Sequence, residues 1–439
     1  MFGLAGLCAA DDFDLPDDVK ETEVLRIVPI EATNTSDNAH IQEPVVTEVQ
    51  NEIVAPQTEK KSDGLKRRRI PENLDRPIRV GIFVGVKELY IKYRGEKIKV
   101  TASGQNIKLQ SGFRSIEMES REFSANDGEC IAVAPDTKHL EKSCFPGMVL
   151  FKAEKGKVTA INAVDVEDYL RGVVPYEIGK LDSSRIEALK AQAVAARTYA
   201  YKHFGSRESV GFDVYADTKD QVYKGLESAT PLTDNAVKAT RGIVMTYGGD
   251  FIIAYYHSTC GGKTETMATW GRGELPYLHV RPDIRSDGTP WCNESSYIKW
   301  ERRFSDRGIN NLLKKHALEA KAQFSTANGN QFKKIKSIQI TNKLKSGRVL
   351  NLQVQTDKGH FDVVGDKTRW LFKENSNILP SSFFQINHQS NEWVIKGTGF
   401  GHGVGMCQMG VRERAKAGQS FIEILNHYYH GITLEQFTR

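Results

Sequence analysis

The sequence predicts an α+β fold in which a β-rich part precedes a part of mixed helices and strands. Short alternating runs of apolar and polar residues fill about residues 77–168, as strands require. Helical periodicity begins only after this part, and strands and helices come in runs, not in a βαβ alternation. A chain of 439 residues with 39% hydrophobic residues can hold two or three domains with proper cores.

Several strands and the longest helix can be identified directly in the sequence. The runs "RVGIFVGV", "KELYIKY" and "KIKVTAS" alternate in polarity and are separated by Gly, Asn and charged turns. The segment "SSRIEALKAQAVAARTYAYKHF" opens with Ser184 and Glu187 at the spacing of a capping box, which predicts a helix start. Apolar residues then recur along one stripe of this helix: Ile186, Leu189, Ala193, Ala196 and Ala200.

Three later segments complete the prediction. "TDNAVKATRG" indicates a short helix that Gly242 ends. "IVMTYGGDFIIAYYHS" indicates two strands around a Gly248-Gly249 turn. "SFIEILNHYYHG" repeats the capping box with Ser420 and Glu423 and predicts a helix up to Gly431.

The N-terminal end differs in composition from the rest. "MFGLAGLCAA", residues 1–10, is typical of the second half of a signal peptide, the alternative being an ordinary disordered apolar start. Residues 11–76 are predicted to be a disordered acidic tether, since residues 1–63 carry a net charge of −10. The basic run "LKRRR" at 65–69 ends this tether and receives no specific role.

The remaining body is cationic and suits an anionic polymer. The whole chain carries +5 and residues 1–63 carry −10, so residues 64–439 carry +15. We expect no nucleic acid partner, because zinc-finger spacing, basic-region heptads and RNA-binding aromatic motifs are all missing from the sequence. No apolar run approaches about 20 residues, so membrane attachment is expected only through the N-terminal signal.

The cysteines allow two readings. Cys130 with Cys144, and Cys260 with Cys292, can each close a short loop, which would stabilise the fold by about 2–4 kcal/mol in an oxidising compartment. That agrees with export. The second reading, a zinc site of His257, Cys260 and Cys292, lacks the paired C-x-x-C spacing that makes such a prediction strong. Free buried thiols are the remaining alternative.

One carboxylate and two cations are candidate site residues. Glu177 lies in the predicted connection between the β-rich part and the long helix, and connections on a rigid frame often carry catalytic groups. Taken alone, such a Glu is more often a surface residue. Lys190 and Arg197 are seven residues apart and share a helix face, where they can line a substrate groove or simply face solvent.

Two histidine segments are further candidates. His257 and Ser258 lie at a predicted strand end, but no G-x-S-x-G elbow supports a hydrolase triad. We interpret His257 as a hydrogen-bond donor that lines the groove, the alternative being a core histidine. His402 stands in the Gly-rich segment 397–410, which lacks P-loop and G-x-G-x-x-G spacing and therefore does not predict nucleotide binding.

Taken together, ordered motifs give the chain a resemblance to a known family. "VEDYLRGVVPYEI", "EALKAQAVAARTYA", "ATRGIVM", "HSTCGGKTE", "WGRGELPYL", "SGRV" and "GFGHGVGMCQMG" occur in this order. The chain resembles the SpoIID/LytB family of peptidoglycan-acting proteins over residues 77–439, with a catalytic part at about 169–439. It departs from the family at Cys260 and Cys407, where Ser is usual. Cys260 with Cys292 then indicates a disulfide variant, while relatives with metal nearby leave zinc open.

The resemblance implies a lytic transglycosylase in which Glu177 is the single catalytic acid and base. Its substrate would be peptide-stripped glycan strands, and the product would be 1,6-anhydro-N-acetylmuramic acid. Burial beside Val173, Val174 and Tyr176 would raise the pKa of Glu177 toward 6–7, as an acid catalyst needs. The predicted substrate-binding residues are Tyr176, Lys190, Arg197, His257, Ser258 and His402.

The resemblance also implies alternatives and a location. Some relatives resemble enhancers that bind and activate a separate cell-wall amidase, and a structural glycan binder is a third, weaker possibility. The expected location is extracytoplasmic, in the periplasm or the cell envelope. No cofactor is implied.

Overall fold

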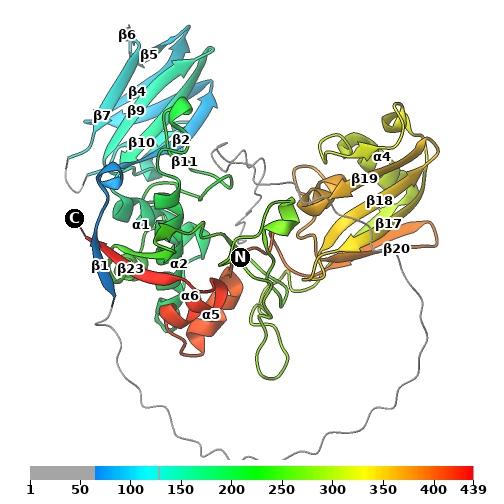
Figure 1. Ribbon diagram of the computed structural model, residues 1–439. Coiled ribbons are helices and arrows are strands. Elements are labelled where there is room, and N and C mark those ends of the chain that lie inside the picture. Colours follow the sequence, from blue (N-terminus) through cyan, green and yellow to red (C-terminus); the bar gives the residue numbers. More distant parts are fainter. Residues whose placement is uncertain (1–64, 127–128, 439) are drawn as a thin grey trace, which may run out of the picture. The chain divides into compact units, whose positions relative to one another are not determined.

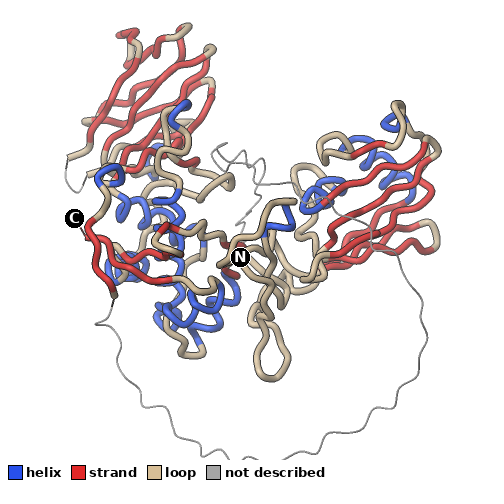
Figure 2. Tube along the Cα trace, in the orientation of Figure 1, coloured by secondary structure: helices blue, strands red, loops and turns tan. Residues whose placement is uncertain are grey.

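The computed structural model describes residues 65–126 and 129–438, and these form the predicted α+β fold (Figures 1 and 2). The expected signal peptide, residues 1–10, and the tether up to residue 64 lie outside the described residues. Within the described ranges, every helix is too short or too polar to span a bilayer.

Two five-stranded sheets make up the β-rich part. One has the order β11 (Val214–Tyr215), β2 (Ile78–Val86), β10 (Lys157–Val164), β9 (Met148–Glu154) and β7 (Ser120–Ser124). The other has the order β6 (Arg114–Met118), β5 (Asn106–Ser111), β4 (Glu96–Ser103), β3 (Glu88–Tyr93) and β8 (Ala132–Ala134). Strands β4 and β5 contact β9, so alternating apolar residues of both sheets meet in one core. The predicted disulfide between Cys130 and Cys144 is present.

Helix α1 (Val166–Glu177) replaces the predicted connection that was to carry Glu177. The side chain of Asp165 caps the helix by accepting a hydrogen bond from the Glu167 amide. Gly172 and Pro175 are poor helix formers, and for this reason the sequence does not predict a helix here. Pro175 is tolerated because burial of the apolar face compensates for the missing amide donor.

Helix α2 (Ile186–Lys202) confirms the predicted long helix, but its predicted capping box is wrong. The side chain of Asp182 instead accepts from the Ser184 amide, at the start of a 3-10 turn (Ser183–Arg185). Glu187 accepts a hydrogen bond from the Phe421 amide at 2.8 Å and pairs with Lys190. Residues 191–201 are buried on all sides, because α1, α3 (Pro231–Ala239), α5 (Gln408–Lys416), α6 (Phe421–Tyr428) and β12 (Ile243–Tyr247) contact this helix.

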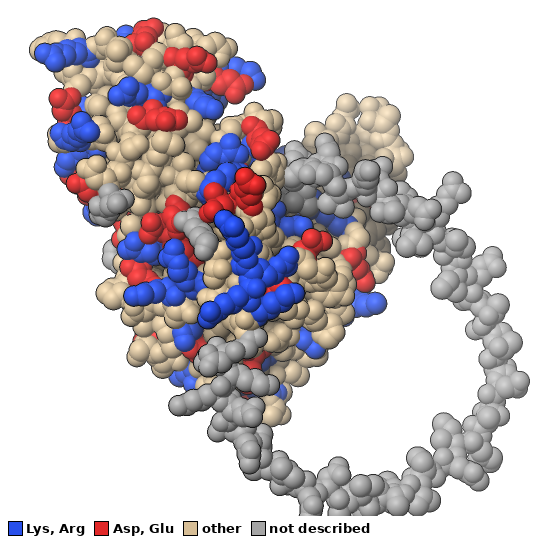
Figure 3. All heavy atoms as spheres, turned by 60° about the vertical axis from the view of Figure 1, so that its left-hand side comes forward, with Lys and Arg blue, Asp and Glu red and all other residues tan. Residues whose placement is uncertain are grey.

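The C-terminal sheet corrects the predicted limit of the tether. Its strand order is β1 (Lys66–Arg69), β23 (Thr433–Thr438), β12 and β13 (Asp250–Phe251). Residues 66–76 therefore belong to the fold, because β1 pairs with β23 in parallel and Arg68 forms a 2.9 Å ion pair with Glu435. All four residues of β1 are exposed, and the face in Figure 3 carries a cluster of Lys and Arg among scattered acidic groups.

The other local predictions hold in outline. Helix α3 is followed by Gly242 at φ +72°, where a Cβ atom would lie 2.1 Å from the carbonyl oxygen of Phe437. Strands β12 and β13 pair around the predicted glycine turn. The capping box of Ser420 and Glu423 is present in α6, although that helix ends at Tyr428 and not at Gly431.

A further core, which the sequence did not separate, lies within residues 300–395. One sheet has the order β15 (Trp300–Ser305), β21 (Glu392–Gly397) and β20 (Phe384–Gln389), and another has β16 (Gln323–Phe324), β19 (Gly359–Val364), β18 (Val349–Thr356) and β17 (Ile335–Lys343). Helix α4 (Asp306–His316) and the 3-10 segment η7 (Gly365–Phe372) pack with them. After this core, β22 (Met406–Cys407) pairs in parallel with β14 (Tyr256–His257), which brings two distant signature segments together.

Candidate functional site

Glu177 ends helix α1 in the wall of a cavity of about 310 Å³. One carboxylate oxygen accepts a hydrogen bond from the Val222 amide at 2.7 Å. The other is 3.4 Å from Nε2 of Gln408, the first residue of α5. Protein atoms surround the carboxyl group on most sides, while the residue keeps part of its surface open to the cavity. The arrangement holds a carboxyl group at a fixed position inside a cleft.

Burial raises the pKa of Glu177 to about 7, because removing a carboxylate from water disfavours its charged form. Hydrogen bonds from the Val222 amide, Gln408 and Tyr256 act in the opposite direction but do not cancel the effect. At neutral pH the protonated and ionised forms are therefore both populated, which is the condition for a group that donates and then accepts a proton.

The cavity offers flat apolar surfaces beside polar groups. The rings of Tyr297 and Phe400 lie 4.4 Å apart, centroid to centroid, with 37° between their planes. Rings of this kind pack against the C–H faces of sugars, while hydroxyl and charged groups bind sugar oxygens. The remaining residues of the lining are Tyr176, Ile178, Ser258, Glu294, Ser295, Ser296, Gln408, Met409 and Arg412. The structure thus brings the predicted residues Tyr176 and Ser258 together with Glu177.

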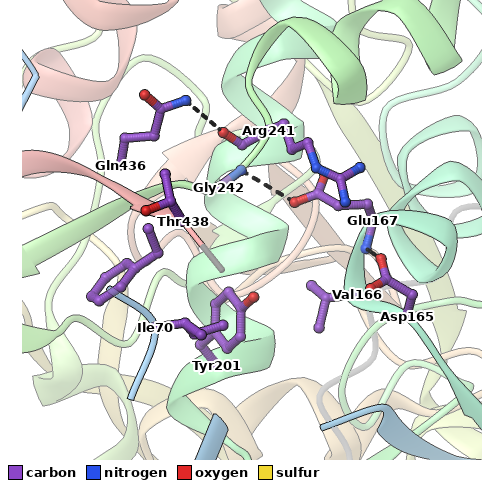
Figure 4. A pocket seen from close by; sticks show the side chains of 10 residues that line it. Ile70, Asp165, Val166, Glu167, Tyr201, Arg241, Gly242, Gln436 and Thr438 are labelled. Atoms are coloured by element: carbon purple, nitrogen blue, oxygen red, sulfur yellow. Dashed lines mark hydrogen bonds between the residues drawn. The ribbon is translucent and has the colours of Figure 1, made fainter. Parts of the chain in front are cut away.

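Lys190 and Arg197 are not part of this cavity. Arg197 is fully buried and binds both oxygens of Glu167, at 2.8 and 2.7 Å. Figure 4 shows Glu167 at a second cavity, of about 210 Å³, where it also accepts from the Gly242 amide. The predicted substrate contact of Arg197 is therefore wrong, since its guanidinium links α2 to α1. Lys190 pairs with Glu187 at 2.6 Å, outside the lining of the Glu177 cavity.

His257 and His402 are likewise buried, so their prediction as groove-lining residues is wrong. Nδ1 of His257 lies 3.1 Å from the carbonyl oxygen of Val404, and Nδ1 of His402 accepts from the Val404 amide. Their rings lie 5.5 Å apart, and Trp270 packs on His402. Burial lowers the pKa of both histidines, that of His402 to about 3, so both are neutral.

Sequence reasoning missed several residues of the cavity. Gln408 and Phe400 lie in the Gly-rich segment 397–410, in which the sequence predicts only His402 to be a site residue. Tyr297 and Arg412 carry no local signal, because only the tertiary fold brings residues that are 115 positions apart to one cavity.

The second predicted disulfide is also wrong. Cys260 and Cys292 are free thiols with their sulfur atoms 3.6 Å apart. Cys407 is a third buried free thiol, and its ligand atom lies within 4.8 Å of those of Cys260 and His257. Within the part of the chain that the structure describes, His257, Cys260 and Cys407 form the group whose ligand atoms lie close enough to hold a metal ion.

Comparisons with known proteins show which family the chain belongs to. The family model "Stage II sporulation protein" (SpoIID) matches residues 154–247, which include Glu177, and a domain of unknown function matches residues 284–405. The chain is 32% identical over 298 residues to an uncharacterized protein of Brachyspira hyodysenteriae, covering 67% of this chain and 73% of that protein.

Two relatives carry descriptive names. An amidase enhancer of Bacillus subtilis is 30% identical over 298 residues, which cover 61% of this chain and 40% of the enhancer. A stage II sporulation protein D of Bacillus amyloliquefaciens is 28% identical over 316 residues, covering 69% of this chain and 83% of that protein. With its ordered motifs, the chain belongs to the SpoIID/LytB family.

Proposed function

We propose that this protein is a lytic transglycosylase of the bacterial cell wall, in which Glu177 acts first as the acid and then as the base. The observation that carries the proposal is one carboxyl group at the wall of a sugar-sized cavity with its pKa raised to about 7. The proposed place of action is outside the cytoplasm, on the glycan strands.

The reaction needs only one such group. Ordinary glycosidases use two carboxyl groups, one to protonate the leaving oxygen and one as base or nucleophile. In a lytic transglycosylase the C6 hydroxyl of N-acetylmuramic acid attacks its own anomeric carbon. Glu177 gives its proton to the glycosidic oxygen as that bond breaks, and the resulting carboxylate takes the proton of the C6 hydroxyl as the 1,6-anhydro ring closes. The Val222 amide and Gln408 stabilise the carboxylate between the two steps.

Arg412 supports peptide-stripped strands as the substrate. Removal of the stem peptide leaves a free lactyl carboxylate on each N-acetylmuramic acid. Arg412 lines the cavity, and its Nε has no hydrogen-bond partner among the described residues. Burial and the nearby cation Arg185 lower the pKa of Arg412, and the carboxylates of Glu413 and Asp182 only partly offset this effect. A lactyl carboxylate would supply that anion.

Glu294 also lines the cavity and is the natural control. A hydrolase would need a second carboxylate to activate water. Glu294 is exposed, whereas Glu177 is held by two donors. The proposal therefore predicts that Glu294→Gln still yields anhydro ends, while Glu177→Gln yields none.

A second candidate function is activation of a cell-wall amidase, which the name of the Bacillus subtilis relative favours. Both functions can use the cavity, but only the transglycosylase needs the acid. The test is to assay Glu177→Gln separately for cleavage of stripped strands and for stimulation of an added N-acetylmuramoyl-L-alanine amidase. Loss of cleavage with retained stimulation separates the two functions, and retained cleavage by this variant refutes the role of Glu177.

A further inference from the structure

Four metal-ligating side chains meet beside the site from three separate segments of the chain. His257 ends β14 and Cys260 lies three residues later, Cys407 ends β22, and Cys292 comes from the loop before β15. All four residues are completely buried. The sulfur atoms of Cys260 and Cys292 are 3.6 Å apart, and the ligand atoms of His257, Cys260 and Cys407 lie within 4.8 Å of one another.

His257 presents an unused nitrogen to this cluster. A carbonyl oxygen can only accept, so the contact of Nδ1 with the Val404 oxygen places the ring hydrogen on Nδ1. Nε2 then carries a lone pair, and it has no hydrogen-bond partner although it is buried. Leaving such an atom unsatisfied costs about 1–3 kcal/mol. Metal-binding histidines have this arrangement, in which a backbone carbonyl orients the ring from the other side.

Burial raises the pKa of Cys260 and Cys407 and keeps both thiols neutral without a cation, but backbone amides are in place to stabilise thiolates that bind one. The amides of Cys260 and Gly410 point at the sulfur of Cys407, at 3.2 and 3.4 Å, and the Gly262 amide points at that of Cys260, at 3.3 Å. Cys407 is also the N-cap of α5, where the helix dipole stabilises negative charge.

A buried cation lies close by. Arg348 is fully buried, donates to the carbonyl oxygen of Cys260 at 3.0 Å, and keeps Nε and Nη1 without partners among the described residues. An acidic neighbour, Asp283, is 3.3 Å from the sulfur of Cys260, but Arg414 and Tyr428 already bind its two oxygens. The cluster can therefore accept a net negative charge that Arg348 offsets.

We propose that Cys260, Cys292, Cys407 and Nε2 of His257 bind one Zn²⁺ ion in a tetrahedral site. Three thiols lose their protons on binding, and Zn²⁺ with three thiolates leaves a net charge of −1. A Zn–S distance of about 2.3 Å places tetrahedral thiolates about 3.8 Å apart, close to the spacing of Cys260 and Cys292. Thiols at this spacing in a protein with an oxidised Cys130–Cys144 pair would be open to oxidation unless a metal held them.

The metal would fix the walls of the cavity that contains Glu177. Each of three ligands lies within two residues of a residue that lines the cavity: His257 beside Ser258, Cys407 beside Gln408, and Cys292 two positions before Glu294. The role proposed for the zinc is structural, because four protein ligands leave no open position for substrate. The site does not depend on the function proposed for Glu177.

The experiment uses the full chain, purified without chelators and with its native disulfide. Elemental analysis is expected to find one zinc per chain. Replacement by Co²⁺ is expected to give the visible bands of a tetrahedral site and the near-ultraviolet bands of thiolate ligands. Cys407→Ser and His257→Asn are expected to lower zinc affinity by more than the roughly 10–100-fold that outer-shell changes cost. The double variant Cys130→Ser/Cys144→Ser is the matched control and is expected to keep its zinc.

Two results would overturn the proposal. One is a folded wild-type chain that binds neither zinc nor cobalt and has four titratable thiols, that of Cys8 and those of the three cysteines of the cluster. The other is a Cys260–Cys292 disulfide in peptides from the native protein. Both are measured on the wild-type chain, so a variant that fails to fold does not leave the proposal untested.

Discussion

The raised pKa of Glu177 predicts how the stability of the protein depends on pH. The unfolded value is about 4.5 and the folded value about 7. Between these values the folded chain holds a proton that the unfolded chain has lost, so the free energy of unfolding falls as pH rises. A shift of about 2.5 pH units at 1.36 kcal/mol per unit makes the full loss about 3 kcal/mol, reached above about pH 8.

Replacing Glu177 with Gln removes this term while keeping the shape of the side chain. The variant and the wild type are expected to be equally stable near pH 4, and the variant more stable by about 3 kcal/mol near pH 8.5. The measurement is denaturant unfolding of both proteins across this range, with the difference between them cancelling every other titrating group. Glu294→Gln, which removes an exposed carboxylate at the same cavity, is expected to show no such pH-dependent gain. A difference between Glu177→Gln and wild type that stays constant from pH 4 to 8.5 would refute the burial argument.

Three further predictions follow from the same geometry. The kcat/KM for stripped strands is expected to fall by about tenfold per pH unit above about pH 7, as Glu177 loses its proton, and a flat profile to pH 9 would contradict its role as the acid. Arg412→Gln is expected to lower kcat/KM for stripped strands by roughly 10–100-fold, since a charge-assisted hydrogen bond contributes about 1.5–3 kcal/mol. An equal loss of kcat/KM on peptide-bearing strands would exclude recognition of the lactyl carboxylate. Arg197→Gln is expected to reduce the free energy of unfolding by about 3–5 kcal/mol, because it leaves the carboxylate of Glu167 without its cationic partner. The KM of the folded variant is expected to stay unchanged. A raised KM would show that Arg197 contacts the substrate.

The order of elements could be predicted from sequence because it depends on local signals. Alternating runs indicate the β-rich part, and the motif around Glu177 marks this residue as the candidate acid. Helix α1 was missed because Gly172 and Pro175 argue locally against a helix, whereas burial of one face outweighs them. Strand β1 was missed because Lys66–Arg69 pair with β23, about 370 residues away.

The errors in the site have one physical origin. Periodicity shows which residues share a helix face but not which faces are covered, so Arg197 was placed in a groove although other elements enclose α2 on all sides. The same holds for His257 at a strand end and His402 in a Gly-rich segment, because neither local pattern shows whether the side chain meets a cavity or the core. Cys407 was left without a partner, since only the pairing of β14 with β22 brings it to Cys260.

The most direct measurement is mass spectrometry of the products formed from peptide-free glycan strands. Proton transfer by the single group Glu177, with ring closure by the sugar's own hydroxyl, predicts fragments that all end in 1,6-anhydro-N-acetylmuramic acid and carry no oxygen from labelled water. Reducing ends that incorporate labelled water would show hydrolysis, and the proposed mechanism would be wrong.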